Sequence, residues 1–231
     1  MKILAVDTAT QTSSVAITDN ATILVELTVN HAKTHAAFLM KMIQHILETA
    51  FLTLKDIDGF AITIGPGSFT GLRIGLSSIK GISAGTGKPV IGVSTLETLA
   101  HTIPYTSTCI CPMIDARKDQ VYCARYRYHH GVLINELPVR SIKPLSAIQG
   151  LSEPCIFIGN GAVAYKNMIV EQLGNSALFV RPDQNMIKAS VAALLSLPKF
   201  LIGETDPVET LVPAYARKSD AETNIENCKK N

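Results

Sequence analysis

The sequence predicts an α/β protein of two packed halves, each built on a mixed sheet. Two observations predict this fold class. Short apolar runs of strand length give way to segments with helical periodicity, and this order occurs twice, in residues 1–103 and in 104–216. The 231 residues are 47% hydrophobic and 17% charged, and no low-complexity linker separates the halves, so one packed unit is expected. A polar tail follows at 217–231, where fraying is expected.

The first half opens with three short strands. Residues 2–7 form an apolar run, and in 13–18 apolar residues alternate with polar ones. Asp19-Asn20 supplies turn chemistry before a third strand at 23–29. A helix is expected over 34–51, because its apolar residues recur at spacings of three and four: Leu39, Met42, Ile43, Ile46, Leu47 and Ala50.

Strands and helices then alternate to residue 103. A strand at 60–64 precedes the glycine-rich segment 65–75, which opens a helix ending near Gly85. A strand at 89–93 follows, and Ser94-Thr95 with Glu97 predicts the cap of a third helix. Three antiparallel strands followed by alternating helices and strands are, by analogy, half of an actin-like, hexokinase-type (ASKHA) fold.

The second half begins near Pro104 with another group of strands. Strands are expected at 108–114, 120–128, 133–141 and 155–158. Helices are expected at 162–173 and 189–197.

Charge and cysteine content exclude several classes of protein. A net charge of +2 gives no general attraction to nucleic acid, so any contact with RNA is expected to be local or shared with a partner. The start MKILAV is too short for a signal-peptide core, and no apolar run reaches membrane length, so a cytoplasmic protein is expected. Apolar strands carry Cys109, Cys111, Cys123 and Cys155, which favours buried, reduced thiols over a metal site.

Two turns stand where an actin-like ATPase would cradle phosphates, and neither has the expected glycines. The first reads Asp7-Thr8-Ala9-Thr10, with Ala9 where the Asp-x-Gly-Thr form has glycine. The second reads Asp115-Ala116-Arg117-Lys118-Asp119, with two long cations. A Cβ blocks close approach of backbone to phosphate, so both turns predict a degenerate site without a nucleotide cofactor.

Two further glycine segments have alternative readings. The segment Gly65 to Gly71 precedes a helix as a phosphate loop does, but it lacks the Gly-Lys-Ser/Thr ending, so a turn in which Ser68 or Thr70 caps the helix is favoured. Gly159-Asn160-Gly161 is either a remnant of an adenosine-side turn or an ordinary strand-to-helix turn, and the ordinary turn is favoured.

The first two long helices have more apolar surface than one covered face needs. In the helix 71–85, small residues form a low ridge that includes Gly71, Gly75 and Ser78, and glycine inside a helix requires tight packing to offset its cost. In the helix 34–51, Phe38 and Met42 begin a wide apolar arc. Either the two helices cover each other or a partner protein covers them, and both alternatives stay open.

Two polar patterns invite functional readings that the sequence does not favour. His31 and His35 have the spacing of a helical metal pair, but a third ligand is missing and His35 suits a helix start, so no metal is expected. In the strand 122–128, Arg125 and Arg127 alternate with tyrosines, which suits either a strip facing RNA or, as favoured, a solvated sheet face.

At this point six segments resemble the TsaB (YeaZ) family, in the same order and across nearly the whole chain. They are ILAVDTAT, IGPGSFTGLRIG, PVIGVSTLETLA, MIDARKDQVY, IGNG and VPAYAR. The resemblance implies a bacterial subunit for making threonylcarbamoyladenosine (t6A) at position 37 of tRNAs that read codons beginning with A. It also implies a paralogue of the catalytic subunit TsaD, whose His-x-x-x-His metal pair is matched in TsaB proteins only at His35.

The resemblance implies no catalytic residue in this chain and a set of partners. A TsaD-type subunit would bind through the first two long helices, with Phe38, Met42, Gly71, Gly75 and Ser78 at or near the contact. A TsaE-type ATPase and tRNA would join through the complex, and a homodimer would form when the chain is alone. Two alternatives remain, an active actin-like kinase with Asp7 and Asp115 on magnesium, and a metallopeptidase. Neither is favoured, because no metal triad or activated nucleophile can be assembled.

Overall fold

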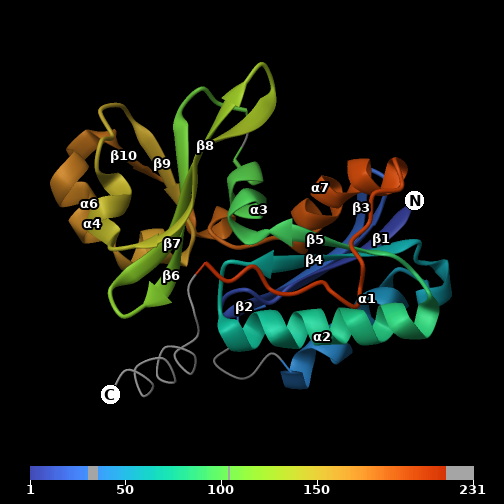
Figure 1. The fold of residues 1–231 in the computed structure, drawn as a ribbon. Helices are drawn as coiled ribbons and strands as arrows, with labels where there is room; N and C mark the ends of the chain where they lie inside the picture. Colours follow the sequence, from blue (N-terminus) through green and yellow to red (C-terminus); the bar gives the residue numbers. More distant parts are fainter. Residues whose placement is uncertain (31–35, 104, 217–231) are drawn as a thin grey trace, which may run out of the picture.

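The structure, a computed structural model, describes residues 1–30, 36–103 and 105–216. Figure 1 shows two lobes side by side, each built around a five-stranded sheet. The strand order is β3-β2-β1-β4-β5 in the first sheet and β10-β9-β6-β7-β8 in the second. Both sheets mix parallel and antiparallel pairs, which confirms the predicted fold class.

The first sheet contains the predicted strands of the first half. Its β2 lies antiparallel between β1 and β3, while β4 runs parallel to β1 and β5 parallel to β4. Successive side chains point to opposite faces, so Leu4 and Val6 enter one core while Ile3 and Ala5 enter another. The strands are β1 (Lys2–Asp7), β2 (Thr12–Asp19), β3 (Thr22–Asn30), β4 (Gly59–Gly65) and β5 (Val90–Ser94).

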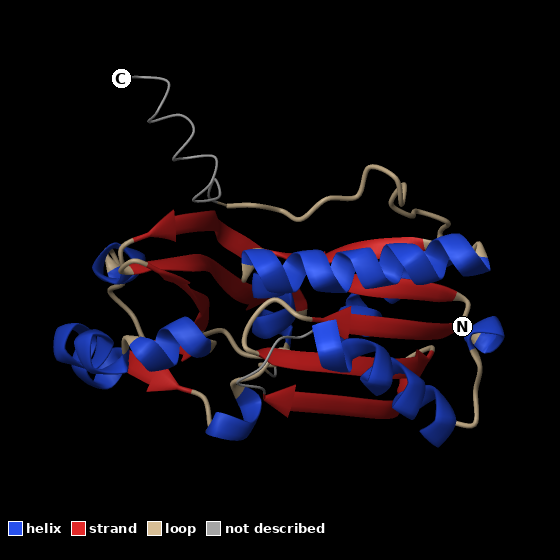
Figure 2. Cartoon of the chain, turned by 90° about the horizontal axis from the view of Figure 1, so that it is seen from below, coloured by secondary structure: helices blue, strands red, loops and turns tan. Residues whose placement is uncertain are grey.

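Helices cover both faces of this sheet. In Figures 1 and 2, α1 (Ala36–Thr49) and α2 (Phe69–Thr86) lie on one face. The opposite face is covered by α7 (Ala189–Leu201), whose small side chains let it pack closely on the strands. The predicted caps are confirmed, since Ser68 begins α2 and Ser94 begins α3 (Thr95–His101).

The last part of the chain returns to the first sheet. Helix α7 contacts β1, β2, β4 and β5, and its N-terminal residue Ala189 donates its backbone N–H to Ser14 Oγ. Further along, the N–H of Asp206 donates to Val90 O and that of Ala214 donates to Ile64 O. Residues 189–214, which sequence order groups with 104–216, therefore contribute to the first lobe.

The second sheet has α3 on one face and short helices on the other. The core on the α3 side of this sheet includes side chains of α3 together with Ala9 and Leu72 of the first lobe. Helix α3 therefore connects the two lobes. The strands are β6 (Cys109–Arg117), β7 (Gln120–His129), β8 (Val132–Ile142), β9 (Cys155–Ile158) and β10 (Ala177–Phe179), and the helices are α4 (Pro144–Ile148), α5 (Asn160–Ala164) and α6 (Lys166–Leu173).

Three details differ from the sequence prediction. The single helix expected over 162–173 is two, because Tyr165 leaves helical geometry between α5 and α6 and its ring packs on the core beneath them. Helix α7 continues through Pro198 to Leu201 instead of ending at 197. The prediction omitted α4 and β10, which are too short for their periodicity to register.

The cysteine prediction is confirmed for the thiols that the structure describes. Cys109, Cys111, Cys123 and Cys155 are free, buried and part of one apolar core of the second lobe. Burial raises the pKa of the Cys123 thiol to about 12, so these side chains serve as small apolar residues of the core.

Candidate functional site

The first predicted phosphate turn is closed by the chain itself. Thr8 and Ala9 are fully buried, and the loop that leads into α2 lies directly on them. The N–H of Ser68 donates to Ala9 O at 2.6 Å, and Thr8 Oγ1 donates to Gly71 O at 2.8 Å. A Cβ built on Gly67 would stand 2.3 Å from Ala9 O. The space that a phosphate would need beside this turn is thus filled by backbone.

Asp7 is sealed beneath the same turn. Its Oδ1 accepts hydrogen bonds from Thr63 Oγ1 at 2.5 Å and from the Ala9 N–H at 3.3 Å. Its Oδ2 is buried without a hydrogen-bond partner. Burial raises the pKa of Asp7 to about 7, although both hydrogen bonds oppose that change. A carboxyl group with this pKa is half protonated near neutral pH.

The second predicted turn is a strained hairpin between β6 and β7. Arg117, Lys118 and Asp119 all have positive φ, at 59°, 51° and 52°, a region that costs energy for residues other than glycine. Asp115 supports the hairpin, because its Oδ1 accepts the Arg117 N–H at 2.9 Å. The backbone N–H of Asp115 in turn donates to Asn160 Oδ1 at 3.1 Å.

The third turn, Gly159-Asn160-Gly161, needs its glycines for packing within the chain. A Cβ on Gly159 would lie 2.3 Å from Met113 O, and one on Gly161 would lie 2.9 Å from the Asp115 nitrogen. The Gly159 N–H donates to Asn185 Oδ1 at 2.5 Å. The close approach of β9 and α5 to the end of β6 therefore explains the motif without a phosphate.

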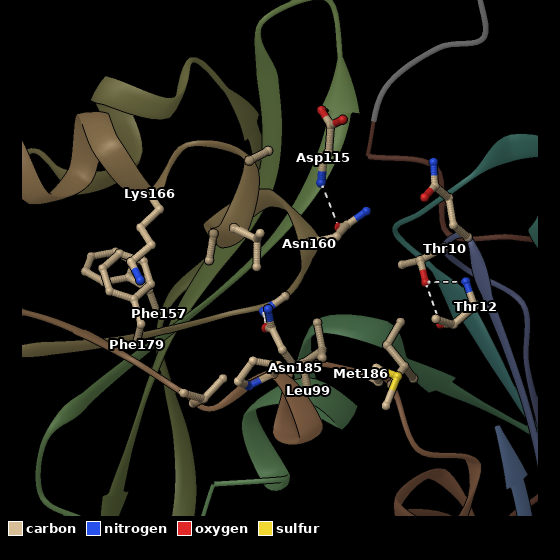
Figure 3. A pocket seen from close by; sticks show the side chains of 18 of the residues that line it. Thr10, Thr12, Leu99, Asp115, Phe157, Asn160, Lys166, Phe179, Asn185 and Met186 are labelled. Atoms are coloured by element: carbon tan, nitrogen blue, oxygen red, sulfur yellow. Dashed lines mark hydrogen bonds between the residues drawn. The ribbon is translucent and has the colours of Figure 1, made fainter. Parts of the chain in front are cut away.

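A cavity of about 630 Å³ lies between these turns and the start of β2 (Figure 3). Asp115 lines it, whereas Asp7 is absent from its lining and has no exposed surface. The alternative kinase would need both carboxylates on one magnesium ion, and this arrangement does not bring them into one open site. Among the described residues, no group of three or more His, Cys, Asp or Glu side chains is placed to hold a metal.

The predicted interface residues fall into two groups. Gly71 and Gly75 face inward, because a Cβ on them would stand 2.1 Å from Thr8 O and 2.3 Å from Thr8 Oγ1. Met42 is only 5% exposed and belongs to the core beneath the first sheet. These three residues cannot themselves form a contact surface, since the chain's own turn and sheet cover them. Phe38 and Ser78 are half-buried.

Helix α2 presents a different small-residue surface, which we call the α2 strip. Its members recur at helical spacing on one side of the helix. Gly81 and Gly85 are exposed, and a Cβ on either would meet open space. Three half-exposed side chains on the same side of the helix complete the strip, which consists of Ile74, Ser78, Gly81, Ile82 and Gly85. Sequence reasoning identified the ridge but could not tell which of its glycines face the chain's own interior.

The structure shows how the two arginines of β7 are used. Arg125 donates to the carbonyl oxygens of Ala147 and Gln149 at the end of α4. Arg127 donates to Ser107 O and pairs with Glu136 and Glu153. Both guanidinium groups therefore hold elements of the second lobe together. His31 and His35 lie outside the described residues.

Thr8 and Thr63 are the residues of this region that sequence reasoning missed. Thr8 ties the first turn to α2, and Thr63 is the hydroxyl donor to Asp7. A single threonine at the end of an apolar strand gives no signal of such a role. Asp7 was recognisable because it ends the apolar strand β1.

Comparison with known proteins identifies the family. Residues 25–225 match the sequence model of the TsaD family, described as tRNA N6-adenosine threonylcarbamoyltransferase. The tRNA threonylcarbamoyladenosine biosynthesis protein TsaB of Escherichia coli is 34% identical over 228 residues, and that of Bacillus subtilis 31% over 225, with 96% of each chain covered in both cases. The chain belongs to the TsaB (YeaZ) family.

Solved structures agree with the TsaB assignment. YeaZ from Pseudomonas aeruginosa matches with a TM-score of 0.78 and 25% identity, over 93% of this chain and 99% of that one. Component A of (R)-2-hydroxyglutaryl-CoA dehydratase from Acidaminococcus fermentans matches with a TM-score of 0.54 and 13% identity, over 86% and 98%. The second similarity shows only that this chain shares its fold with that protein.

Proposed function

We propose that this chain acts in t6A biosynthesis as a non-catalytic subunit that binds and supports a TsaD-type enzyme. The modification would lie at position 37 of tRNAs that read codons beginning with A. The proposal rests on the TsaB family membership and on one observation of the structure. The turn that would hold phosphates is covered by the Gly65–Gly71 loop, which the Ser68 and Thr8 hydrogen bonds hold in place.

The proposed contact with the TsaD-type subunit is the α2 strip, together with the neighbouring part of α1. The strip exposes backbone and small side chains, which let a second helix approach closely. Phe51, two residues beyond the end of α1, is 95% exposed, and so large an apolar side chain has a strong tendency to be buried. The strip replaces Gly71, Gly75 and Met42 as the proposed surface. Ser78 belongs to the strip, and Phe38 is a half-buried residue of α1.

The remaining partners follow from the same proposal. A TsaE-type ATPase and tRNA would associate with the assembled complex, mainly through the TsaD-type subunit. A homodimer of the isolated chain would use the α2 strip in place of TsaD. No helix in the described residues is long and apolar enough to cross a membrane.

Two adjacent substitutions on α2 test the contact. Gly85→Arg places a long cation at the C-terminal end of the α2 strip, whereas the control Ala84→Arg places it on the polar side of the same helix turn. Both positions are exposed, so both variants should fold, as circular dichroism would verify. We expect co-purification with the cognate TsaD to be lost for Gly85→Arg and retained for Ala84→Arg.

Two results would contradict the proposal. If Gly85→Arg pairs with TsaD as the parent chain does, the contact lies elsewhere. If the purified chain hydrolyses ATP with magnesium, and Asp115→Asn abolishes that hydrolysis, the chain is an actin-like ATPase and not a supporting subunit.

A further inference from the structure

A second, smaller cavity lies in the second lobe, where β7 and β8 meet α4. In Figure 1, α4 lies on the side of this lobe that is remote from the first lobe, and the two cavities share no lining residue. We call this cavity the α4 hollow; its polar lining consists of Arg125, Arg140, Ser146 and Gln149. Its volume of about 180 Å³ is below the range of sites that enclose a whole small molecule. The α4 hollow is therefore suited to one chemical group of a ligand.

The α4 hollow exists because β8 bends away from β7. The register of the two strands shifts between Cys123 and Arg125. At that point Pro138 and Val139 stand opposite Ala124 alone. Proline has no N–H to donate to the ladder, and a bulge of this kind bends its strand and re-aims the neighbouring side chains. The sheet therefore opens at this edge, beside α4.

Arg125 holds a guanidinium group in a fixed orientation at the α4 hollow. Its Nη2 donates to Ala147 O at 2.9 Å and to Gln149 O at 2.7 Å. A guanidinium has five N–H donors, and Nε and Nη1 of Arg125 form no hydrogen bond with any described residue. These donors are held in place by the other two bonds, so a ligand would bind them at little further cost in side-chain entropy.

Arg140 supplies a second guanidinium group from β8. It pairs with Cys123, which lies two residues before Arg125 on the same face of β7. Diagonal neighbours of this kind lie about 7–8 Å apart, so two arginine side chains can reach one group placed between them. Arg140 is exposed and forms no ion pair with any described residue. Its charge is therefore available to a ligand.

The positive charge of the α4 hollow is not compensated by its own lining. Among the described residues that line it, none carries a carboxylate. The nearby Glu136 and Glu153 both pair with Arg127. Ser146 and Gln149 add a hydroxyl and an amide as neutral donors. Two guanidinium groups with neutral donors and no carboxylate select an anion that offers several oxygens.

From this arrangement we infer that the α4 hollow binds a phosphate group. Arg125 and Arg140 donate to its oxygens from two sides, and the Ser146 hydroxyl adds a third donor. The group is either a free phosphate or phosphomonoester, or one phosphate of an RNA backbone, since the same donors recognise both. The inference concerns the second lobe and does not depend on the α2 strip, so either can fail without the other.

Titration of the full chain with inorganic phosphate, followed by the NMR signals of the arginine Nε–H groups, tests the inference. The ionic strength is held constant with sodium chloride, because diffuse attraction between charges is screened by salt. The signals of Arg125 and Arg140 should shift and saturate. The signal of Arg73 should not shift, since its Nε donates to Tyr215 in the first lobe.

Two substitutions separate a built site from general positive charge. Arg140→Gln removes a cation that lines the α4 hollow, whereas the control Lys143→Gln removes one just before α4 that does not line it. Both positions are exposed, so both variants should fold. Arg140→Gln should weaken phosphate binding by about fivefold or more, and Lys143→Gln should weaken it by less than about twofold.

A parallel titration with a tRNA transcript identifies the source of the phosphate. If tRNA shifts the same two signals and inorganic phosphate displaces it, the group belongs to an RNA backbone. If only inorganic phosphate shifts them, the ligand is a free phosphate or a phosphomonoester. Both results support a phosphate site in the α4 hollow.

Three results would overturn the inference. The first is that the Arg125 and Arg140 signals stay unchanged with phosphate and with tRNA. The second is that sodium chloride alone shifts them as much as phosphate does. The third is that Arg140→Gln and Lys143→Gln weaken binding equally, which would mean that only the general charge of this surface attracts the anion.

Discussion

Replacing Asp7 by asparagine should stabilise the protein above neutral pH. The native carboxyl group has a pKa of about 7, against 3.8 for the ordinary value. Asparagine has the same shape, keeps the oxygen that accepts from Thr63 and Ala9, and cannot ionise. The variant therefore reproduces the protonated side chain at every pH.

The sign of the effect follows from proton linkage. Between pH 3.8 and about 7 the native state holds a proton that the unfolded state has released, so stability falls as pH rises through this window. Above about pH 7 both states are ionised, and the native state carries the whole free-energy cost of the buried charge. Taking about 1.4 kcal/mol for each pH unit, the interval from 3.8 to about 7 corresponds to about 4 kcal/mol.

Urea denaturation at several pH values measures the effect. Subtracting the parent curve from that of Asp7→Asn removes the contribution of groups common to both chains. The advantage of the variant should grow by about 3 kcal/mol between about pH 5 and about pH 8.5. Thr63→Val removes the hydroxyl donor that favours the charged form of Asp7. This variant should therefore lose more stability than the parent chain as the pH rises.

Two outcomes would refute this reasoning. A difference between Asp7→Asn and the parent that is independent of pH would show that the carboxyl group does not titrate in this window. A variant that is less stable at high pH would show that the ionised form is favoured, which requires a donor to Oδ2.

The remaining predictions concern packing and local structure. Gly71→Ala should destabilise the chain by about 2 kcal/mol in urea denaturation, because its Cβ would meet Thr8 O at 2.1 Å. Gly81→Ala, whose Cβ would stand in open space, should instead raise stability by up to about 1 kcal/mol. Equal effects of the two substitutions would contradict the assignment of inner and outer glycines. Ser68→Ala should cost about 1 kcal/mol, since Ser68 Oγ accepts the Gly71 N–H at 3.3 Å; no loss would mean that the cap contributes nothing. The four cysteines of the second lobe's core should resist alkylation in the folded protein and react after unfolding, as mass spectrometry would show; rapid labelling of the native chain would contradict their burial.

Much of the fold was predictable because its elements are long and regular. Alternating apolar residues specify β2, and the spacing of Leu39, Ile43 and Ile46 specifies the buried side of α1. The strands of the second sheet follow similarly from residues 108–158. By contrast, α4 and β10 contain too few residues for any period. The position of α7 on the first sheet depends on contacts between distant parts of the chain, such as that of Ala189 with Ser14, 175 residues apart.

The candidate site was predictable only in its parts. Ala9 and Arg117 could be interpreted as departures from phosphate-binding turns because each lies at or just beyond the end of a recognisable strand. The covering of Ala9 by the Gly65–Gly71 loop could not be predicted, because the hydrogen bonds that hold the loop join residues about 60 positions apart. The same is true of the cavity, whose lining ranges from Thr10 to Ile187.

The sequence by itself determined the α/β class, the order of the strands and the family, because local periodicity and motif order survive without knowledge of contacts. The tertiary structure alone decided which glycines of α2 face inward. A glycine at 71 and one at 81 look alike in the sequence, yet the first lies against Thr8 and the second against open space. That difference arises from the direction in which the helix packs on the sheet, a property that no single segment carries.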